Sequence, residues 1–377
     1  MSGPTLGFPS LVLTVAAVVL GSLLVAAVLV TVGYSLLAAR RHRRRESMRA
    51  DLRSGLLDRL YGPEDPDWVS WVAGLSAASR DELESLLDVY LRQLEGSDAA
   101  RLAELGVALG IPDRSRREIA EGDYWNRLHA LTWLALLRDP PDRKLLEDHC
   151  TGTPRERAAA VRVLYMGDAP DLATTGVDLL LENDPSAFSV FGIDTLYRVG
   201  EADPSPLLTR AAAEFDEWDP ALQQQVLSVT GHLHSVVGDA DLSWVVEALS
   251  NPEERVRVAA WRALGAYGWN GSLRAGIDTT TITADPSPVV RASAYRLLGA
   301  WGDPDALDVL RSVAATEPDG RTRVVAAEAL LASRPRASIA STGATDPPEG
   351  LEEAWAWAVE HVRFDERARD VSRGSPG

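Results

Sequence analysis

The sequence predicts an all-α protein, an α-solenoid of repeated helical hairpins preceded by one transmembrane helix. Three observations predict this fold class. Pairs of a helix-capping residue and a proline recur along the chain at spacings of 31 to 35 residues. Apolar residues follow these pairs with the period of an amphipathic helix. A long uncharged stretch lies close to the N-terminus.

The uncharged stretch covers residues 11–39 and contains no Asp, Glu, Lys or Arg. At about 1.5 Å of rise per residue, a helix of this length exceeds the ~30 Å hydrocarbon core of a bilayer. A cleavable signal peptide is the alternative, but it needs a shorter apolar segment behind a basic one, and residues 1–10 contain no Lys or Arg. We therefore expect a transmembrane helix over 11–39, preceded by an extracytoplasmic stub at 1–10.

A basic run, RRHRRR at 40–45, follows the apolar stretch. By the positive-inside rule, this run keeps the C-terminal side of the span in the cytoplasm. We expect a single-pass protein of the cell membrane, with its N-terminus outside and its repeat domain cytoplasmic. The basic run opens a juxtamembrane collar and amphipathic linker at 40–75, which we expect to contact the membrane. The single cysteine, Cys150, suits a reducing compartment.

The net charge of the chain is −17 at pH 7 although the collar is basic, so the rest of the chain is strongly acidic. Nucleic-acid binding depends on basic side chains that neutralise phosphates, and we therefore expect no nucleic-acid partner. The acidity is consistent with a surface for basic partners. The interpretation we favour is solubility, or adaptation to a salty or arginine-rich proteome, since the chain has the single lysine Lys144.

The segment DPSPVVRASAYRLLGAWGDPDAL at 285–307 shows the repeated unit. Asp285 is a capping residue, and Pro286 takes the first helical position, where its missing N–H costs nothing. Gly302 ends this helix, and Asp303 followed by Pro304 begins a second one. One stripe of the first helix holds the apolar residues Val290, Ala294, Leu297, Leu298 and Trp301. The unit is therefore a helical hairpin, and neither helix can bury its stripe alone.

The same unit recurs along the chain. NPEERVRVAAWRALGAYGWNGSL, beginning at Asn251, repeats it 34 residues upstream, with Arg257 at the position of Arg291. A further unit opens at Asp123 without a proline, and we expect the solenoid to cover 76–335. The pairs of cap and proline stand at Thr153-Pro154, Asp184-Pro185, Asp219-Pro220, Asn251-Pro252, Asp285-Pro286 and Glu317-Pro318.

These residues resemble the HEAT and HEAT-like repeats of α-solenoids, whose units have a D-P-x-x-x-V-R-like start followed by A-x-x-A-L-G. The resemblance is clear over 120–335, although the repeats that begin at 184 and 219 have Val190 and Gln225 where the arginine is expected. In this family, the arginine of the first helix pairs with an acidic residue of a neighbouring loop. The resemblance therefore implies a structural ladder formed by Arg257, Arg291 and Arg323.

The C-terminal part of the chain has its own pattern. Residues 336–350 are rich in Ser, Thr, Gly and Pro and predict a linker. Residues 351–370 predict a helix, and we expect it to fold back on the last repeat as a cap, because the end of a solenoid needs an atypical unit. Residues 371–377 are expected to be disordered.

The sequence contains no motif of a convergent catalytic site. G-x-x-x-x-G-K-[ST], G-x-S-x-G and H-E-x-x-H are all absent. His232 and His234 would stand about 200° apart around a helix axis, and such a pair cannot bind one metal ion. We therefore expect no catalytic residue, no cofactor, no metal and no small-molecule substrate.

The prediction for function is a membrane-anchored cytosolic scaffold or adaptor that binds a partner protein through its repeat surface, and not an enzyme. The alternative is a protein-modifying or chaperone-like factor, as in the lyases that contain similar repeats. Candidate contact residues on second helices or turns are Trp244, Trp269 and Arg311, because Trp and Arg dominate interface hot spots. Core packing of the two tryptophans and a solvated position for the arginine are the alternative.

Overall fold

The computed structural model describes residues 15, 18, 20–22, 24, 31, 46–62, 66–182, 186–237, 240–278, 285–333 and 347–373. Every regular element within these ranges is a helix, and no strand occurs among them. This all-helical architecture fits an α-solenoid. The chain divides into two compact units, residues 1–114 and residues 115–377, which are described separately.

The expected transmembrane helix is not borne out. Most of residues 11–39, and the basic run at 40–45, lie outside the described residues. Where the structure describes the chain, no helix combines the length and the apolar character that a bilayer crossing requires. A crossing needs roughly 20 consecutive apolar residues in one helix. The prediction of a single-pass membrane protein is therefore corrected.

The first unit is a small group of helices around leucine side chains. Residues 46–60 are helical, followed by α2 (Trp68–Ala73), α3 (Ala77–Leu91) and α4 (Gly96–Ala108), and α4 contacts both α2 and α3. Leu56 and Leu60 of the first helix, four residues apart and so on one face of it, are fully buried, which agrees with the predicted amphipathic linker. Ser76 caps α3 by accepting from the Ser79 amide at 3.2 Å.

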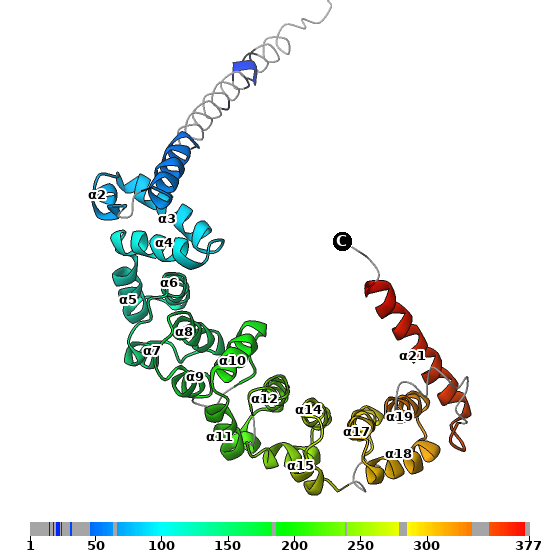
Figure 1. The fold of residues 1–377 in the computed structure, drawn as a ribbon. Helices are drawn as coiled ribbons and strands as arrows, with labels where there is room; N and C mark the ends of the chain where they lie inside the picture. Colours follow the sequence, from blue (N-terminus) through cyan, green and yellow to red (C-terminus); the bar gives the residue numbers. More distant parts are fainter. Residues whose placement is uncertain are drawn as a thin grey trace, which may run out of the picture. The chain divides into compact units, whose positions relative to one another are not determined.

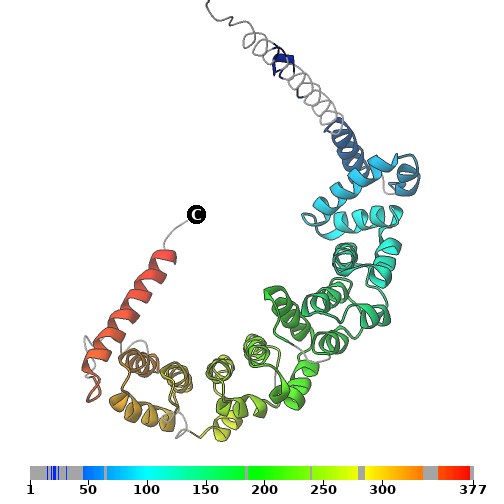
Figure 2. The ribbon, with the colours of Figure 1, turned by 180° about the vertical axis from the view of Figure 1, so that it is seen from behind.

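Paired helices follow one another along the second unit (Figure 1). The first helices of the hairpins, α6, α8, α10, α12, α14, α17 and α19, form one row in which each contacts the next. Figure 2 shows the same row from behind. The bounds of this row are α6 (Tyr124–Leu137), α8 (Pro154–Met166), α10 (Val190–Ala202), α12 (Pro220–His232), α14 (Glu254–Ala266), α17 (Pro288–Trp301) and α19 (Gly320–Ala332).

The second helices form the other row, and all but the last of them are shorter than the first helices. They are α7 (Arg143–His149), α9 (Leu172–Leu180), α11 (Ser205–Glu214), α13 (Ser243–Glu247), α15 (Gly271–Gly276) and α18 (Pro304–Thr316), with 3-10 turns at Phe215–Glu217 and Ala248–Ser250. α5 (Ile111–Glu121) precedes the first hairpin, and α21 (Glu352–Arg373) follows the last. A continuous hydrophobic core runs between the two rows, from Ile119 to Ala358.

The apolar stripes that the sequence predicts form this core. Val290, Ala294 and Leu298 of α17 are at most 2% exposed, and the corresponding Val256 and Leu264 of α14 are fully buried. Burying one Val or Leu side chain stabilises a fold by about 1.5–3 kcal/mol. Each stripe reaches this burial only against the neighbouring hairpins, so the stacking of repeats supplies the stability of each one.

Helix starts follow the predicted capping in part. Thr153, Asp219 and Asp303 each accept from an amide of the first turn and stand directly before a proline, as expected. Asp285 does not cap its helix, because α17 begins at Pro288 and Ser287 accepts from the Val290 amide instead. Two other helices also begin later than expected, with caps at Glu253 and Asp319, and the pair at 184–185 lies outside the described residues.

The C-terminal helix packs on the last repeat. α21 contacts α19, and Leu351, Ala354, Trp355 and Ala358 are buried. The helix continues to Arg373, which is three residues into the tail that the sequence predicts to be disordered. The remaining tail, and most of the predicted linker, lie outside the described residues.

Candidate functional site

Arginines of the first helices join consecutive hairpins of the second unit. Arg257 holds Asp285 with two contacts, Nε to Oδ2 at 2.7 Å and Nη2 to Oδ1 at 3.1 Å. Arg291 holds Glu317 in the same way, at 2.9 Å and 2.6 Å. Each carboxylate stands in the loop that opens the next hairpin. Bidentate pairing of this kind fixes geometry as well as supplying energy, so the pairs set the register between repeats.

The pair between Arg291 and Glu317 is part of a larger buried network. The Tyr295 hydroxyl donates to Glu317 at 2.7 Å, and the Asp319 amide donates to it at 3.0 Å. Burial disfavours ionisation of Glu317, but the hydrogen bonds from Arg291, Tyr295 and Asp319 outweigh burial and hold its pKa below the ordinary value. Burial, followed by the bond to Glu317, raises the pKa of Tyr295. Glu317 is therefore a buried carboxylate that stays ionised.

Arg323 occupies the corresponding position of the last hairpin but has a different partner. It donates from Nε at 2.9 Å and from Nη2 at 2.6 Å to the main-chain carbonyl of Glu317. Arg257 and Arg291 donate in the same way to the carbonyls of Asn251 and Asp285, six residues before each of them. The residues that follow α19, where a further acidic partner would be expected, lie outside the described residues.

Sequence reasoning missed two further members of this ladder. Arg127 holds Glu156 at 2.9 Å and 2.8 Å, and Glu156 is only 1% exposed. Gln223 receives a bond from Asn251 at 3.2 Å and is the neutral equivalent of the ion pairs. The signal for Arg127 was its place four residues after Asp123, a helix start that has no proline. Gln223 stands at the same offset from its cap, Asp219, but a glutamine there does not indicate a link between repeats.

Gln225, which the repeat spacing placed at the arginine position, has another role. It accepts from the Phe188 amide at 2.8 Å and donates to the Phe188 carbonyl at 2.9 Å. Gln225 therefore satisfies an isolated main-chain pair in the loop before α10. Val190, at the arginine position of the preceding repeat, is 84% exposed and stands at the first position of α10.

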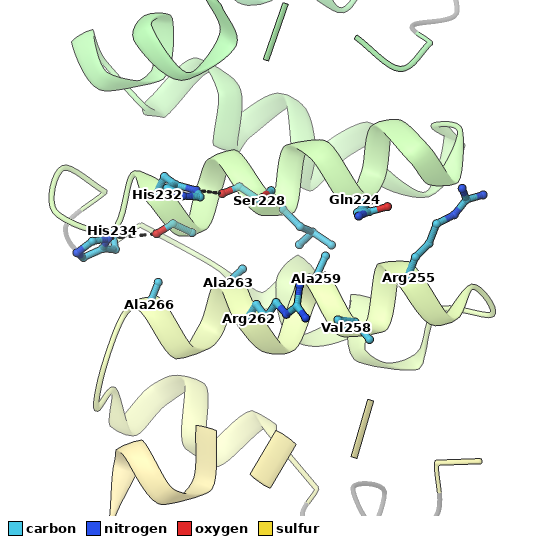
Figure 3. Close-up of a pocket in the computed structure, with 12 residues that line it drawn as sticks. Gln224, Ser228, His232, His234, Arg255, Val258, Ala259, Arg262, Ala263 and Ala266 are labelled. Atoms are coloured by element: carbon cyan, nitrogen blue, oxygen red, sulfur yellow. Dashed lines mark hydrogen bonds between the residues drawn. The ribbon is translucent and has the colours of Figure 1, made fainter. Parts of the chain in front are cut away.

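A groove lies between α12 and α14 on the face of the first-helix row (Figure 3). Its volume is about 440 Å³, within the range of ordinary ligand pockets. Gln224 and Arg255 stand at one end, and His232 and Ala266 stand at the other, so the two helices run in the same direction. Arg262 lies between these ends.

The floor of the groove is made of small side chains where α12 and α14 approach each other. A Cβ added at Gly231 would stand 3.1 Å from the Cα of Ala263. A larger side chain at Gly231 would therefore push the two helices apart. This close approach keeps the groove shallow, and its apolar lining includes Leu227, Val258 and Ala259.

The rim of the groove consists of polar side chains, two histidines and two arginines. Nδ1 of His232 lies 2.7 Å from the Ser228 carbonyl, and Nδ1 of His234 lies 3.1 Å from the Gly231 carbonyl. A carbonyl oxygen only accepts, so each Nδ1 is assigned the proton and each Nε2 is left for another partner. Arg255 and Arg262 add two guanidinium groups, and none of the residues that line the groove is an Asp or a Glu.

The three contact residues predicted from the sequence lie in different settings. Trp244 is 4% exposed and packs against Phe215, with ring centroids 5.0 Å apart, so it belongs to the core and offers no contact surface. Trp269 is 55% exposed and meets Trp301 edge to face. The side chain of Arg311 is 53% exposed and pairs with Asp308 on the same helix. No contact joins any two of the three predicted residues in the described structure.

The described residues contain no cluster of three or more His, Cys, Asp or Glu side chains that could hold a metal ion. Cys150 is buried, and burial raises the pKa of its thiol to about 12. A thiol in this state does not supply the thiolate that nucleophilic catalysis uses.

The C-terminal hairpins are similar to known repeats. A family model described as HEAT repeats matches residues 279–356. This match and the helical hairpins support a HEAT-like repeat protein. HEAT repeat proteins are generally non-catalytic scaffolds that commonly bind protein partners. No curated protein and no solved structure matches the chain.

Proposed function

We propose that this chain is a scaffold that binds a partner protein along the first-helix row of residues 115–373. The observation that carries the proposal is the groove between α12 and α14, whose apolar floor and polar rim provide the two parts of a protein-binding surface. HEAT-like repeats generally serve this role, and their stacked hairpins offer an extended face.

The buried ladder supports this proposal because it makes the surface rigid. In the pair of Arg291 and Glu317 the side chains are 10% and 1% exposed, and in the pair of Arg257 and Asp285 they are 13% and 11% exposed. Pairs with this degree of burial hold neighbouring first helices in one register. A surface that is ordered before binding loses less conformational entropy when the complex forms.

Two residues predicted from the sequence remain candidates for secondary contacts. Trp269 and Arg311 are more than half exposed, and each could extend an interface beyond the groove. For the protein-modifying alternative, the described residues offer no activated cysteine, since burial raises the pKa of the Cys150 thiol.

Chemical cross-linking and affinity capture with the full chain test this function. We expect one partner to be recovered in a constant ratio to the chain and to be chemically unchanged. Clients that are held transiently and released in a modified form would contradict a scaffold role and support the protein-modifying alternative.

A further inference from the structure

We propose that the groove between α12 and α14 binds an acidic, extended peptide segment of the partner protein. This inference rests on the proposed scaffold function and specifies the chemistry of its ligand. The net charge of −17 would point to basic partners, but the charge around this groove has the opposite sign. The charged residues that line it are Arg255 and Arg262, and no carboxylate is among the lining residues.

The guanidinium group of Arg262 forms no hydrogen bond or ion pair with any of the described residues. Arg162 stands five residues after Arg157 in α8 and pairs with Asp194, 32 residues further along. Arg262 stands five residues after Arg257 in α14, and the residue 32 positions further along is the buried Ala294. Arg162 therefore has an acidic partner on the next first helix, whereas Arg262 has an alanine at the corresponding position. Among the described carboxylates, none forms an ion pair with Arg262.

Arg255 is nearly as free to bind a ligand. Its one ion pair is with Glu253 at 4.0 Å, and both side chains are about half exposed, 52% and 50%. Exposed pairs at this distance contribute little, so an incoming carboxylate can replace Glu253 at small cost. Arg255 and Arg262 can both form charge-assisted hydrogen bonds with a ligand.

The dimensions of the groove favour an extended segment. Arg255 and Arg262 are seven residues apart on one helix, a separation of about 10.5 Å along its axis at 1.5 Å per residue. An extended chain in the polyproline II conformation covers about this distance in three residues, and its side chains at i and i+3 lie on the same face. A helical ligand would need space for a cylinder of about 10–12 Å, whereas the contact between Gly231 and Ala263 keeps the floor shallow.

A peptide fits this groove better than a nucleic acid. A nucleic acid gains affinity by neutralising many phosphates along a basic track, and the groove has two arginines on a chain of net charge −17. The lining supplies apolar contacts through the exposed Ala266 and the edges of Val258 and Ala259, which a sugar-phosphate backbone cannot use. Acidic side chains separated by small apolar ones match both the rim and the floor.

Fluorescence anisotropy with the full chain tests the proposal. The probe is a labelled synthetic peptide with glutamate at every third position and alanine or valine between. We expect saturable binding that weakens as salt rises. The double variant Arg255→Glu/Arg262→Glu should bind roughly tenfold more weakly or worse, because two attractive contacts become repulsive. The neutral variant Arg255→Gln/Arg262→Gln should fall between the two.

A matched control changes the net charge by the same amount elsewhere. Arg155→Glu/Arg321→Glu alters two exposed arginines on α8 and α19, outside the groove, and should keep the wild-type affinity. The two arginines of the groove and the two arginines of the control are all exposed, so their replacement should not unfold the chain. Circular dichroism of each variant checks this. Equal losses in the two double variants would overturn the proposal, because they would show a response to net charge alone.

Two further probes decide the class of ligand. A peptide with lysine in place of each glutamate should not bind, and a single-stranded oligonucleotide should bind more weakly than the acidic peptide. Tighter binding of either probe would overturn the proposal. The scaffold function is judged separately by cross-linking. A partner captured equally by the wild type and by Arg255→Glu/Arg262→Glu would leave the scaffold role intact and remove the groove as its site.

Discussion

The substitution Glu317→Ala tests the arginine ladder most sharply. It leaves Arg291 buried without a counter-ion, and breaking a buried pair from one side costs about 3–5 kcal/mol. Arg291 would still donate to the carbonyls of Asp285 at 2.7 Å and Pro286 at 3.2 Å, so we expect the lower end of that range. The Tyr295 hydroxyl also loses its acceptor, a further cost that is not strictly additive.

Thermal unfolding followed by circular dichroism measures this cost. The control is Asp308→Ala, which breaks an ion pair whose side chains are 53% and 74% exposed and should cost less than about 1 kcal/mol. Repeat arrays need not unfold in a single step, so amide hydrogen exchange should locate the loss in α17 and α19. Equal effects of Glu317→Ala and Asp308→Ala would refute the assignment of Glu317 as a structural counter-ion.

Three further predictions follow from the same contacts. Hydrogen bonds overcome burial to lower the pKa of Glu317, so its ionised form stabilises the fold above the unfolded pKa, and this contribution is lost as pH falls through the folded pKa. Melting temperatures on acidification should therefore fall more steeply in the wild type than in Glu317→Gln, and parallel curves would contradict this. Gly299→Ala should lower stability by roughly 1–3 kcal/mol in a denaturant titration, because the new Cβ would stand 2.6 Å from the Ala329 carbonyl oxygen, while Gly320→Ala meets open space and should not destabilise. The buried Cys150 thiol, with its pKa raised to about 12, should react slowly with an aromatic disulfide reagent until denaturant is added, and rapid reaction of the native protein would show that the site opens.

The local parts of the fold could be predicted from the sequence. Helix capping by Thr153 and Asp303 and the apolar stripe around Leu298 depend on residues within a few positions of one another. Periodicity and capping report such short-range physics directly. The helical hairpins and their stacking followed from them.

The start of α17, three residues after Asp285, could not be predicted from residues close in sequence. Asp285 has the sequence of a cap, but the nearest strong cation is Arg257, 28 residues earlier in the chain and adjacent in space. The Asp285 carboxylate pairs with Arg257, and the Ser287 hydroxyl caps α17 in its place. A pattern within one repeat cannot reveal this competition, because the deciding partner belongs to the preceding repeat.

The positive charge of the groove could not be predicted from the composition of the chain either. A net charge of −17 is a sum over the chain and does not say where each sign lies. Arg255 and Arg262 share one face of α14, but they border a groove only because α12 packs beside α14. The helical spacing assumed for His232 and His234 does not hold, because α12 ends at His232 and His234 lies in the turn that follows. Their place on the same rim depends on this helix end.

The most direct test of the account is amide hydrogen exchange of the full chain with and without the acidic peptide. We expect added protection in α12 and α14, at 220–232 and 254–266, and none in α18. The same experiment on Arg255→Glu/Arg262→Glu should show no added protection. Protection that appears on the second helices, or that survives in this variant, would contradict the assignment of the first-helix groove as the binding surface.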